Sequence, residues 1–134
     1  MDKQQHAGVV PVRQAVAIDA RQEVPYFVGI SAQTVGAQGI SMQRVVFPPG
    51  ASARPHSHAG HETAIYILQG HVETRYGPGL REVVVSGPGE FLYVAPNVPH
   101  QSRNISETEA AIGIAARNDA NEQENVIPYD PATE

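Results

Sequence analysis

The amino-acid sequence predicts an all-β barrel or sandwich in a single domain. Segments rich in β-branched and aromatic residues recur at roughly ten-residue spacing, and most of them end at Gly or Pro. Helix signals are weak, because Gly or Pro interrupts most windows long enough to hold an amphipathic helix. The length of 134 residues supports one domain with a modest core. The 12 glycines and 11 prolines are therefore interpreted as turn residues between strands.

Six segments carry the clearest strand patterns. The segment 40–47 mixes β-branched and polar residues and stops at Pro-Pro-Gly. The segment 63–68 is apolar on both faces, so we expect it to be buried on both sides, in a sandwich core or at an interface. The segment 71–76 alternates polar and apolar residues up to Gly-Pro-Gly, as a half-buried strand does. The remaining strands are expected at 81–85, 91–95 and 110–116.

Composition excludes several classes of function. The chain has no cysteine, which excludes disulfides, thiolate zinc sites, iron–sulfur clusters and cysteine nucleophiles. The formal net charge of −5 argues against a nucleic-acid partner, which needs a basic surface. No apolar run reaches the length of a signal peptide or a bilayer span, so we expect a cytoplasmic protein with no membrane partner.

Histidines concentrate in one short stretch of the chain. His56, His58 and His61 lie within six positions. On a strand, the H-x-H spacing places the first two imidazoles on one face, about 6.6–6.8 Å apart along the chain. Two imidazoles on one face can bind one divalent ion. His100 begins another predicted strand after a tight turn at Asn97, a residue that tolerates the left-handed conformation, and this turn could bring His100 over the barrel mouth.

The stretch around His56 resembles the first motif of the cupin family, G-x5-H-x-H-x(3,4)-E-x6-G. The sequence matches it from Gly50 through His56 and His58 to Gly70.

The second cupin motif, G-x5-P-x-G-x2-H-x3-N, resembles the stretch from Gly89 through His100 to Asn104. Ala95 stands in place of the proline and Asn97 in place of the middle glycine. We expect Asn104 to brace the turn rather than to contact a metal.

The resemblance implies a cupin-type double-stranded β-helix, a jelly-roll barrel with little or no helix. It extends over roughly 25–117, with 1–24 as a lead-in that could hold an exchanged strand and 118–134 as a polar acidic tail that wraps the surface or frays. Small cupin barrels are often dimers, so we expect a homodimer.

The first motif departs from the family at its metal-binding glutamate. Counted back from Gly70, that position is Thr63, whereas counting forward from His58 gives Glu62. A shift of one residue reverses the face of a strand. The register counted from Gly70 places Thr63 and His61 on one face, so His61 could replace the missing carboxylate, while a bulge near Gly60 would restore Glu62.

The candidate metal ligands are therefore His56, His58, His61, Glu62 and His100. Imidazoles, with or without a carboxylate, suit one divalent transition metal such as Zn, Fe, Ni, Mn or Cu. The resemblance implies a metal-dependent enzyme on a small polar substrate, of the dioxygenase, isomerase, lyase or decarboxylase class. The alternatives are a non-catalytic module that binds or senses a small ligand or metal, and a metal-free structural barrel. The fold alone cannot choose among these.

Other residues receive weaker interpretations. Arg44 or Arg54 could hold a carboxylate or phosphate bidentately. We interpret His71 as exposed on a hairpin strand and His6 as part of a mobile terminus. Residues that could face the cavity or its rim are Met42, Arg44, Arg54, Ile65, Ile67, Phe91, Tyr93 and Gln101.

Overall fold

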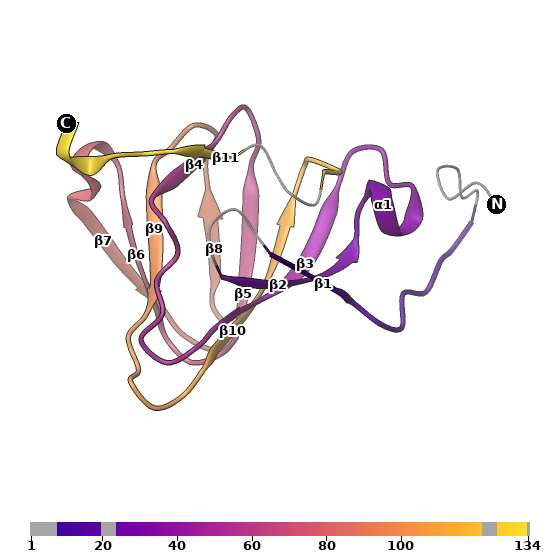
Figure 1. The fold of residues 1–134 in the computed structure, drawn as a ribbon, viewed down its shortest axis with the longest axis horizontal. Helices are drawn as coiled ribbons and strands as arrows, with labels where there is room; N and C mark the ends of the chain where they lie inside the picture. Colours follow the sequence, from indigo (N-terminus) through magenta and orange to yellow (C-terminus); the bar gives the residue numbers. More distant parts are fainter. Residues whose placement is uncertain (1–7, 20–23, 122–125, 134) are drawn as a thin grey trace.

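The structure is a computed structural model that describes residues 8–19, 24–121 and 126–133. Its strands form two antiparallel sheets, ordered β1-β2-β3-β10-β5-β8 and β11-β4-β9-β6-β7 (Figure 1). This arrangement confirms the predicted all-β fold. The strands are β1 Val16–Asp19, β2 Pro25–Ile30, β3 Ser41–Phe47, β4 His56–His58, β5 Thr63–Gln69, β6 Val72–Tyr76, β7 Glu82–Ser86, β8 Phe91–Val94, β9 His100–Asn104, β10 Ala111–Arg117 and β11 Val126–Pro128.

Each of the six segments predicted as strands is a strand, with ends within one residue of the predicted ones. The agreement reflects the burial of one strand face. In β3, buried and more exposed residues alternate along the whole strand. The same alternation runs through β10 from Ala111 to Arg117. One face of each of these strands therefore packs inside the barrel.

Strand β5 buries one face only. Thr63 and Ile67 are buried, whereas Tyr66 and Leu68 on the opposite face are exposed. This confirms the register counted back from Gly70. The expectation that both faces of this strand are buried is wrong for the described residues, because the outer face is exposed.

Two asparagines fix the turns around the predicted site. Asn97 has φ of 64°, the left-handed conformation expected there. Its N–H donates to the carbonyl of His58 and its Oδ1 accepts from the N–H of Gly60, both at 3.0 Å. Asn97 therefore connects the turn before β9 to the chain that follows β4.

Asn104 braces the other end of β9, as predicted. Its side chain is fully buried, and Nδ2 donates to the carbonyls of Phe47, Pro48 and Glu109 at 2.7–3.2 Å. Its Oδ1 accepts from the N–H of Ser106 at 3.0 Å. One amide thus satisfies four backbone groups that would otherwise lack partners.

The C-terminal segment contributes a strand that sequence patterns did not predict. β11 pairs with β4 over three residues, and the N–H of Tyr129 continues this contact to the carbonyl of Pro55. The Tyr129 hydroxyl accepts from the N–H of Gly79 at 2.8 Å, next to the short 3-10 helix η1 Pro78–Leu80. In Figure 1 this yellow segment lies along β4.

A single helical turn, α1 Ala32–Val35, lies between β2 and β3. Ser31 caps it by accepting from the N–H of Thr34, whose side chain accepts from the N–H of Ser31 in return. A second 3-10 turn, η2 Pro131–Thr133, ends the described chain. Among the described residues no helix is long and apolar enough to cross a membrane.

The core lies between the two sheets and includes an open cavity. Its buried side chains come from β2, β3, β5, β6 and β10 together with residues of the connecting segments. A cavity of about 60 Å³ is lined mainly by these apolar side chains and by a few polar ones. The buried core residues are Val24, Tyr26, Val45, Phe47, Ala53, Ile67, Val72, Ala111 and Ala115.

Candidate metal centre

Two adjacent strands bring three histidines together at the cavity. His56 and His58 lie two residues apart on β4, so both side chains point to the same buried face. His100 opens β9 and is the register partner of His56 across the ladder. The H-x-H spacing and the turn at Asn97 therefore place all three imidazoles as the sequence predicted.

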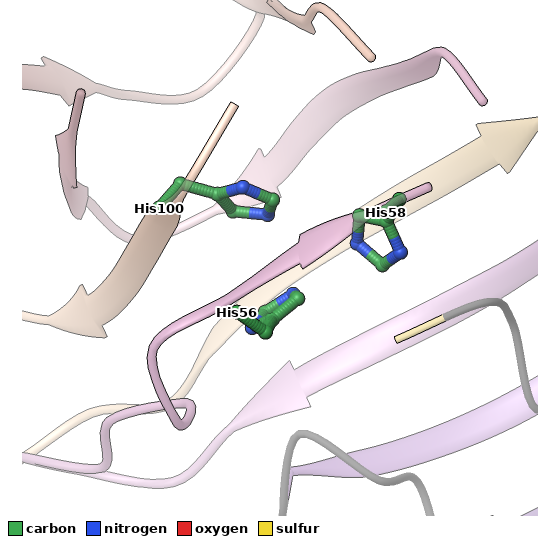
Figure 2. A group of neighbouring side chains, drawn as sticks. All are labelled: His56, His58 and His100. Carbon is green, nitrogen blue, oxygen red and sulfur yellow. The ribbon is translucent and has the colours of Figure 1, made fainter. Parts of the chain in front are cut away.

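The three imidazoles lie in direct contact. Their ring centroids are 4.4 Å apart for His56 and His100, 4.8 Å for His56 and His58, and 5.3 Å for His58 and His100. Figure 2 shows the three rings close together, with His56 and His58 on one strand and His100 on its neighbour. One nitrogen from each ring lies within 4.8 Å of the others. All three residues line the cavity.

Backbone carbonyls select the tautomer of two of these rings. Nδ1 of His56 lies 2.5 Å from the carbonyl oxygen of Arg54, and Nδ1 of His100 lies 2.9 Å from that of Val98. A carbonyl only accepts, so each Nδ1 carries the proton. The lone pair then resides on Nε2, which is the usual arrangement of a metal-binding histidine.

The histidines are neutral at physiological pH. Burial, followed by the neighbouring His100, lowers the pKa of His56 to about 3. Burial, followed by the charge of Arg117, lowers the pKa of His58 to about 2. Burial also lowers the pKa of His100. A transition metal binds the neutral imidazole, so protons do not compete for these three ligands near pH 7.

The donor set fits a divalent transition metal. Three nitrogens bound tetrahedrally at about 2.1 Å lie about 3.4 Å apart, and small side-chain rotations reach this spacing from the one observed. The described residues that line the cavity include no carboxylate or thiolate. An all-nitrogen site of this kind suits Zn, Fe, Ni, Mn or Cu.

His61 and Glu62 lie outside this group of three. The Glu62 side chain is exposed and its Oε2 accepts a hydrogen bond from the Tyr93 hydroxyl at 2.5 Å. Its N–H donates to Asn118. Nδ1 of His61 is buried, has no hydrogen-bond partner among the described residues, and lies 3.8 Å from Oδ2 of Asp119. That either residue completes the metal site stays a prediction.

Sequence reasoning did not predict that Arg117 lies at the cavity. It is buried and lines the cavity beside the histidines. The strand was predicted to end at residue 116 and the polar tail to begin after 117. The signal was present, because Arg117 continues the alternation of Ala111, Gly113 and Ala115.

Most other candidates for the cavity lie elsewhere. Ile65 and Ile67 line it as expected. Gln101 instead donates to the carbonyl of Ala53, and the guanidinium of Arg44 lies 4.6 Å from the ring centroid of Phe27 on the outer surface. The exposed residues of this set are Met42, Arg44, Arg54, Phe91 and Tyr93. His71 is exposed as predicted, and His6 lies outside the described residues.

Comparison with protein families agrees with this fold. Residues 43–115 match the family described as "Cupin domain". The match covers more than half of the 134 residues, and the chain belongs to the cupin family.

Individual proteins either share low sequence identity with the chain or match only part of it. Germin-like protein subfamily T member 3 of Arabidopsis thaliana is 33% identical in an alignment of 79 residues that covers 55% of this chain and 34% of that protein. The chain thus spans about a third of the length of this curated relative.

Two solved structures are similar to the chain in fold. The polyketide cyclase RemF from Streptomyces resistomycificus superposes with a TM-score of 0.73 at 20% identity, covering 93% of this chain and 87% of that one. The oxalate decarboxylase of Lactobacillus farciminis, in a formate complex, gives 0.71 at 19% identity, covering 90% and 36%. At these identities the likeness establishes the fold alone.

Proposed function

We propose that this protein binds one divalent transition metal ion through His56, His58 and His100 and is a metal-dependent enzyme acting on a small polar substrate. The observation that carries the proposal is the contact of three buried, neutral imidazoles at an internal cavity. A bound ion supplies Lewis-acid activation of an oxygen ligand or of water. The reaction class is a dioxygenase, isomerase, lyase or decarboxylase.

Two features favour catalysis over storage of the metal. Three or four protein ligands leave coordination positions for substrate or water on a metal that accepts five or six ligands, as catalytic sites require. The cavity beside the ligands gives a small molecule a place to bind. Enzymes such as oxalate decarboxylase and a polyketide cyclase are built on a similar fold.

We further propose His61, rather than Glu62, as the candidate fourth ligand. His61 is among the neighbouring groups that lower the pKa of His58, which supports a position of its ring close to the site. Its buried Nδ1 has no hydrogen bond in the part of the chain that the structure describes. Glu62 instead turns outward to Tyr93. His61→Ala is expected to weaken metal binding, with Glu62→Gln as the matched control.

Elemental analysis and metal titration test the proposed function directly. The purified protein, reconstituted separately with Zn, Fe, Mn, Ni and Cu, should bind about one ion per chain. His56→Ala and His100→Ala should each weaken the affinity by at least roughly a hundredfold, whereas His71→Ala should leave it unchanged. The absence of metal after all five reconstitutions would refute the metal site. A metal-loaded protein that binds small ligands without turning any over would favour the non-catalytic binding module.

The outer face of the six-stranded sheet supports the proposal of a homodimer. Tyr66 and Leu68 of β5 lie beside Phe91 and Tyr93 of β8, and all four are exposed. The rings of Tyr66 and Phe91 lie 4.8 Å apart. A second copy of the chain would remove this apolar surface from water.

A further inference from the structure

A second pocket lies between the edge strands of the two sheets. β7 ends the five-stranded sheet and β8 ends the six-stranded one, and no backbone ladder joins these two strands in the described chain. This lateral pocket has a volume of about 340 Å³. Its wall carries five aliphatic side chains, those of Val84, Leu92, Val94, Ala95 and Val98. The junction between the two sheets is therefore open and mainly apolar.

The lateral pocket adjoins the central cavity that the three histidines line. Leu92 and His100 line both spaces. The hydroxyl of Thr74, in the lateral pocket, is hydrogen-bonded at 2.9 Å to the hydroxyl of Ser102, in the central cavity. A molecule in the lateral pocket would therefore lie beside His100, one of the proposed metal ligands.

The polar groups of the lateral pocket already have partners within the protein. The Tyr93 hydroxyl donates to Glu62, and Nδ1 of His100 donates to the carbonyl of Val98. The Thr74 hydroxyl is paired as described above. No aspartate, glutamate, lysine or arginine among the described residues lines this pocket. A bound group would gain few hydrogen bonds there but would remove apolar surface from water, so the pocket favours an apolar group.

The two spaces differ in size. The central cavity of about 60 Å³ has room for about four or five water molecules. The lateral pocket of about 340 Å³ lies within the range of roughly 300–1,000 Å³ that is typical of small-molecule sites. A metal-binding group of a few atoms fits the central cavity, whereas an aromatic ring or a branched alkyl chain fits the lateral pocket.

We propose that the lateral pocket binds the apolar part of a small amphipathic molecule, an aromatic ring or a branched alkyl group, whose polar end reaches the proposed metal. This inference rests on the proposed function and names the substrate class of that site. Val84 contacts the apolar part, and Leu92 lies where the two parts of the ligand join, because it lines both spaces.

Two thiols of similar acidity test the inference on the cobalt-loaded full chain. Each thiol places a single sulfur atom on the metal, so the thiolate-to-cobalt absorption band reports the binding of either one. Phenylmethanethiol carries an aromatic ring, and mercaptoethanol carries a polar group. The phenyl compound is expected to bind the wild type roughly tenfold more tightly or better, because its ring leaves water.

Two neighbouring valines of β7 provide the variant and its matched control. Val84 pairs with the buried Thr74 and lines the pocket, whereas Val83 pairs with the exposed Arg75 on the opposite face. Val84→Trp fills the pocket and should reduce the preference for the phenyl compound to about twofold or less. Val83→Trp should keep the wild-type preference. Val84→Asp places a charge in the pocket and should also abolish the preference, which decides the matter if Val84→Trp does not fold.

A measurement on the metal-free protein separates the pocket from the metal site. Toluene has no metal-binding group, so it should bind the lateral pocket whether or not metal is present. It is expected to shift the methyl NMR signals of Val84, Leu92 and Val98. The methyl signals of Val83 and Val85, which are exposed and do not line the pocket, should stay unchanged.

Several outcomes would overturn the inference. They are pocket methyl signals that do not respond to toluene, equal affinity of the wild type for the two thiols, and a preference that survives both substitutions of Val84. A toluene response without a thiol preference would make the lateral pocket a site separate from the metal. A change of oligomeric state in Val84→Trp, seen by light scattering, would assign the pocket to a contact between copies of the chain.

Failure of the metal site gives a different result. If cobalt does not bind the wild type, the proposed function is refuted and the link between pocket and metal falls with it. The toluene titration then still decides whether the pocket binds apolar molecules.

Discussion

At the scale of single residues, the three buried histidines make the stability of the metal-free protein depend on pH. In the unfolded chain a histidine takes up a proton below about pH 6.5, whereas in the folded chain His56 does so only near 3 and His58 near 2. Between these values the unfolded state binds more protons. The free energy of unfolding therefore falls as the pH is lowered from 6.5, by about 1.4 kcal/mol per pH unit for each such histidine.

Urea denaturation of the metal-free protein at pH 7.5, 6.0 and 5.0 measures this dependence. His58→Gln should reduce this slope by about 1.4 kcal/mol per pH unit, the contribution of one buried histidine. A free energy of unfolding that stays constant from pH 7.5 to 5.0 would contradict the prediction.

Asn104 is expected to be the most sensitive polar residue of the scaffold. Asn104→Ala leaves buried carbonyls without a donor and should lower the free energy of unfolding by about 2–4 kcal/mol. Asn104→Asp keeps the volume but turns an oxygen towards those carbonyls, so it should destabilise the protein at least as much. Thermal unfolding by circular dichroism measures both variants. A destabilisation by Asn104→Asp much smaller than that by Asn104→Ala would contradict the role of Nδ2 as a donor.

At the scale of elements, β11 supports the strand that carries two of the histidines. β4 itself has one register pair with β9 but three with β11. No residue of β11 belongs to the core cluster, so the barrel should fold without it. A chain that ends before residue 126 is therefore expected to keep its circular dichroism spectrum but to bind metal roughly tenfold more weakly. Calorimetric titration measures the affinity, and a chain that ends at Asp130 is the control. Unchanged affinity in the shorter chain would mean that Asn97 and β9 alone fix β4.

Sequence patterns predicted six strands of the barrel with their bounds but not the C-terminal strand β11, and the reason for the difference is physical. In β3 and β10, buried positions alternate with more exposed ones over the whole strand, because only one face of each strand is buried. β11 is only three residues long, ends at a proline and forms through pairing with a distant segment. No pattern in the local sequence of β11 indicates that it pairs with β4.

At the scale of the whole molecule, the exposed apolar face predicts self-association. The wild-type chain should be a dimer at micromolar concentration in light scattering. Leu68→Lys combined with Phe91→Lys places charges on the exposed face and should give a folded monomer. The matched control is Val84→Lys, at an exposed position of β7 in the other sheet. A monomeric wild type would refute the dimer, and a dimer that survives the double substitution would place the interface elsewhere.

The site as a whole was only partly predictable. The H-x-H spacing places His56 and His58 on one face by strand geometry alone, and the cupin resemblance adds His100. Arg117 enters the cavity because β10 crosses from one end of the barrel to the other, and this depends on how the sheets pack. The alternation in the sequence predicts that Arg117 lies on the inward face of β10, but it does not predict which residues lie opposite that face.

The single register pair between β4 and β9 also has a kinetic consequence. An ion bound by His56, His58 and His100 would link β4 and β9 at a point where few backbone hydrogen bonds join them. Local opening of β4 would then depend on metal supply, whereas β10, which has seven register pairs with β3 and six with β5, would stay closed regardless. Amide hydrogens of β4 should therefore exchange quickly with deuterium in the metal-free protein and slowly in the loaded one. The metal ion would thereby stabilise the most weakly paired junction of the five-stranded sheet.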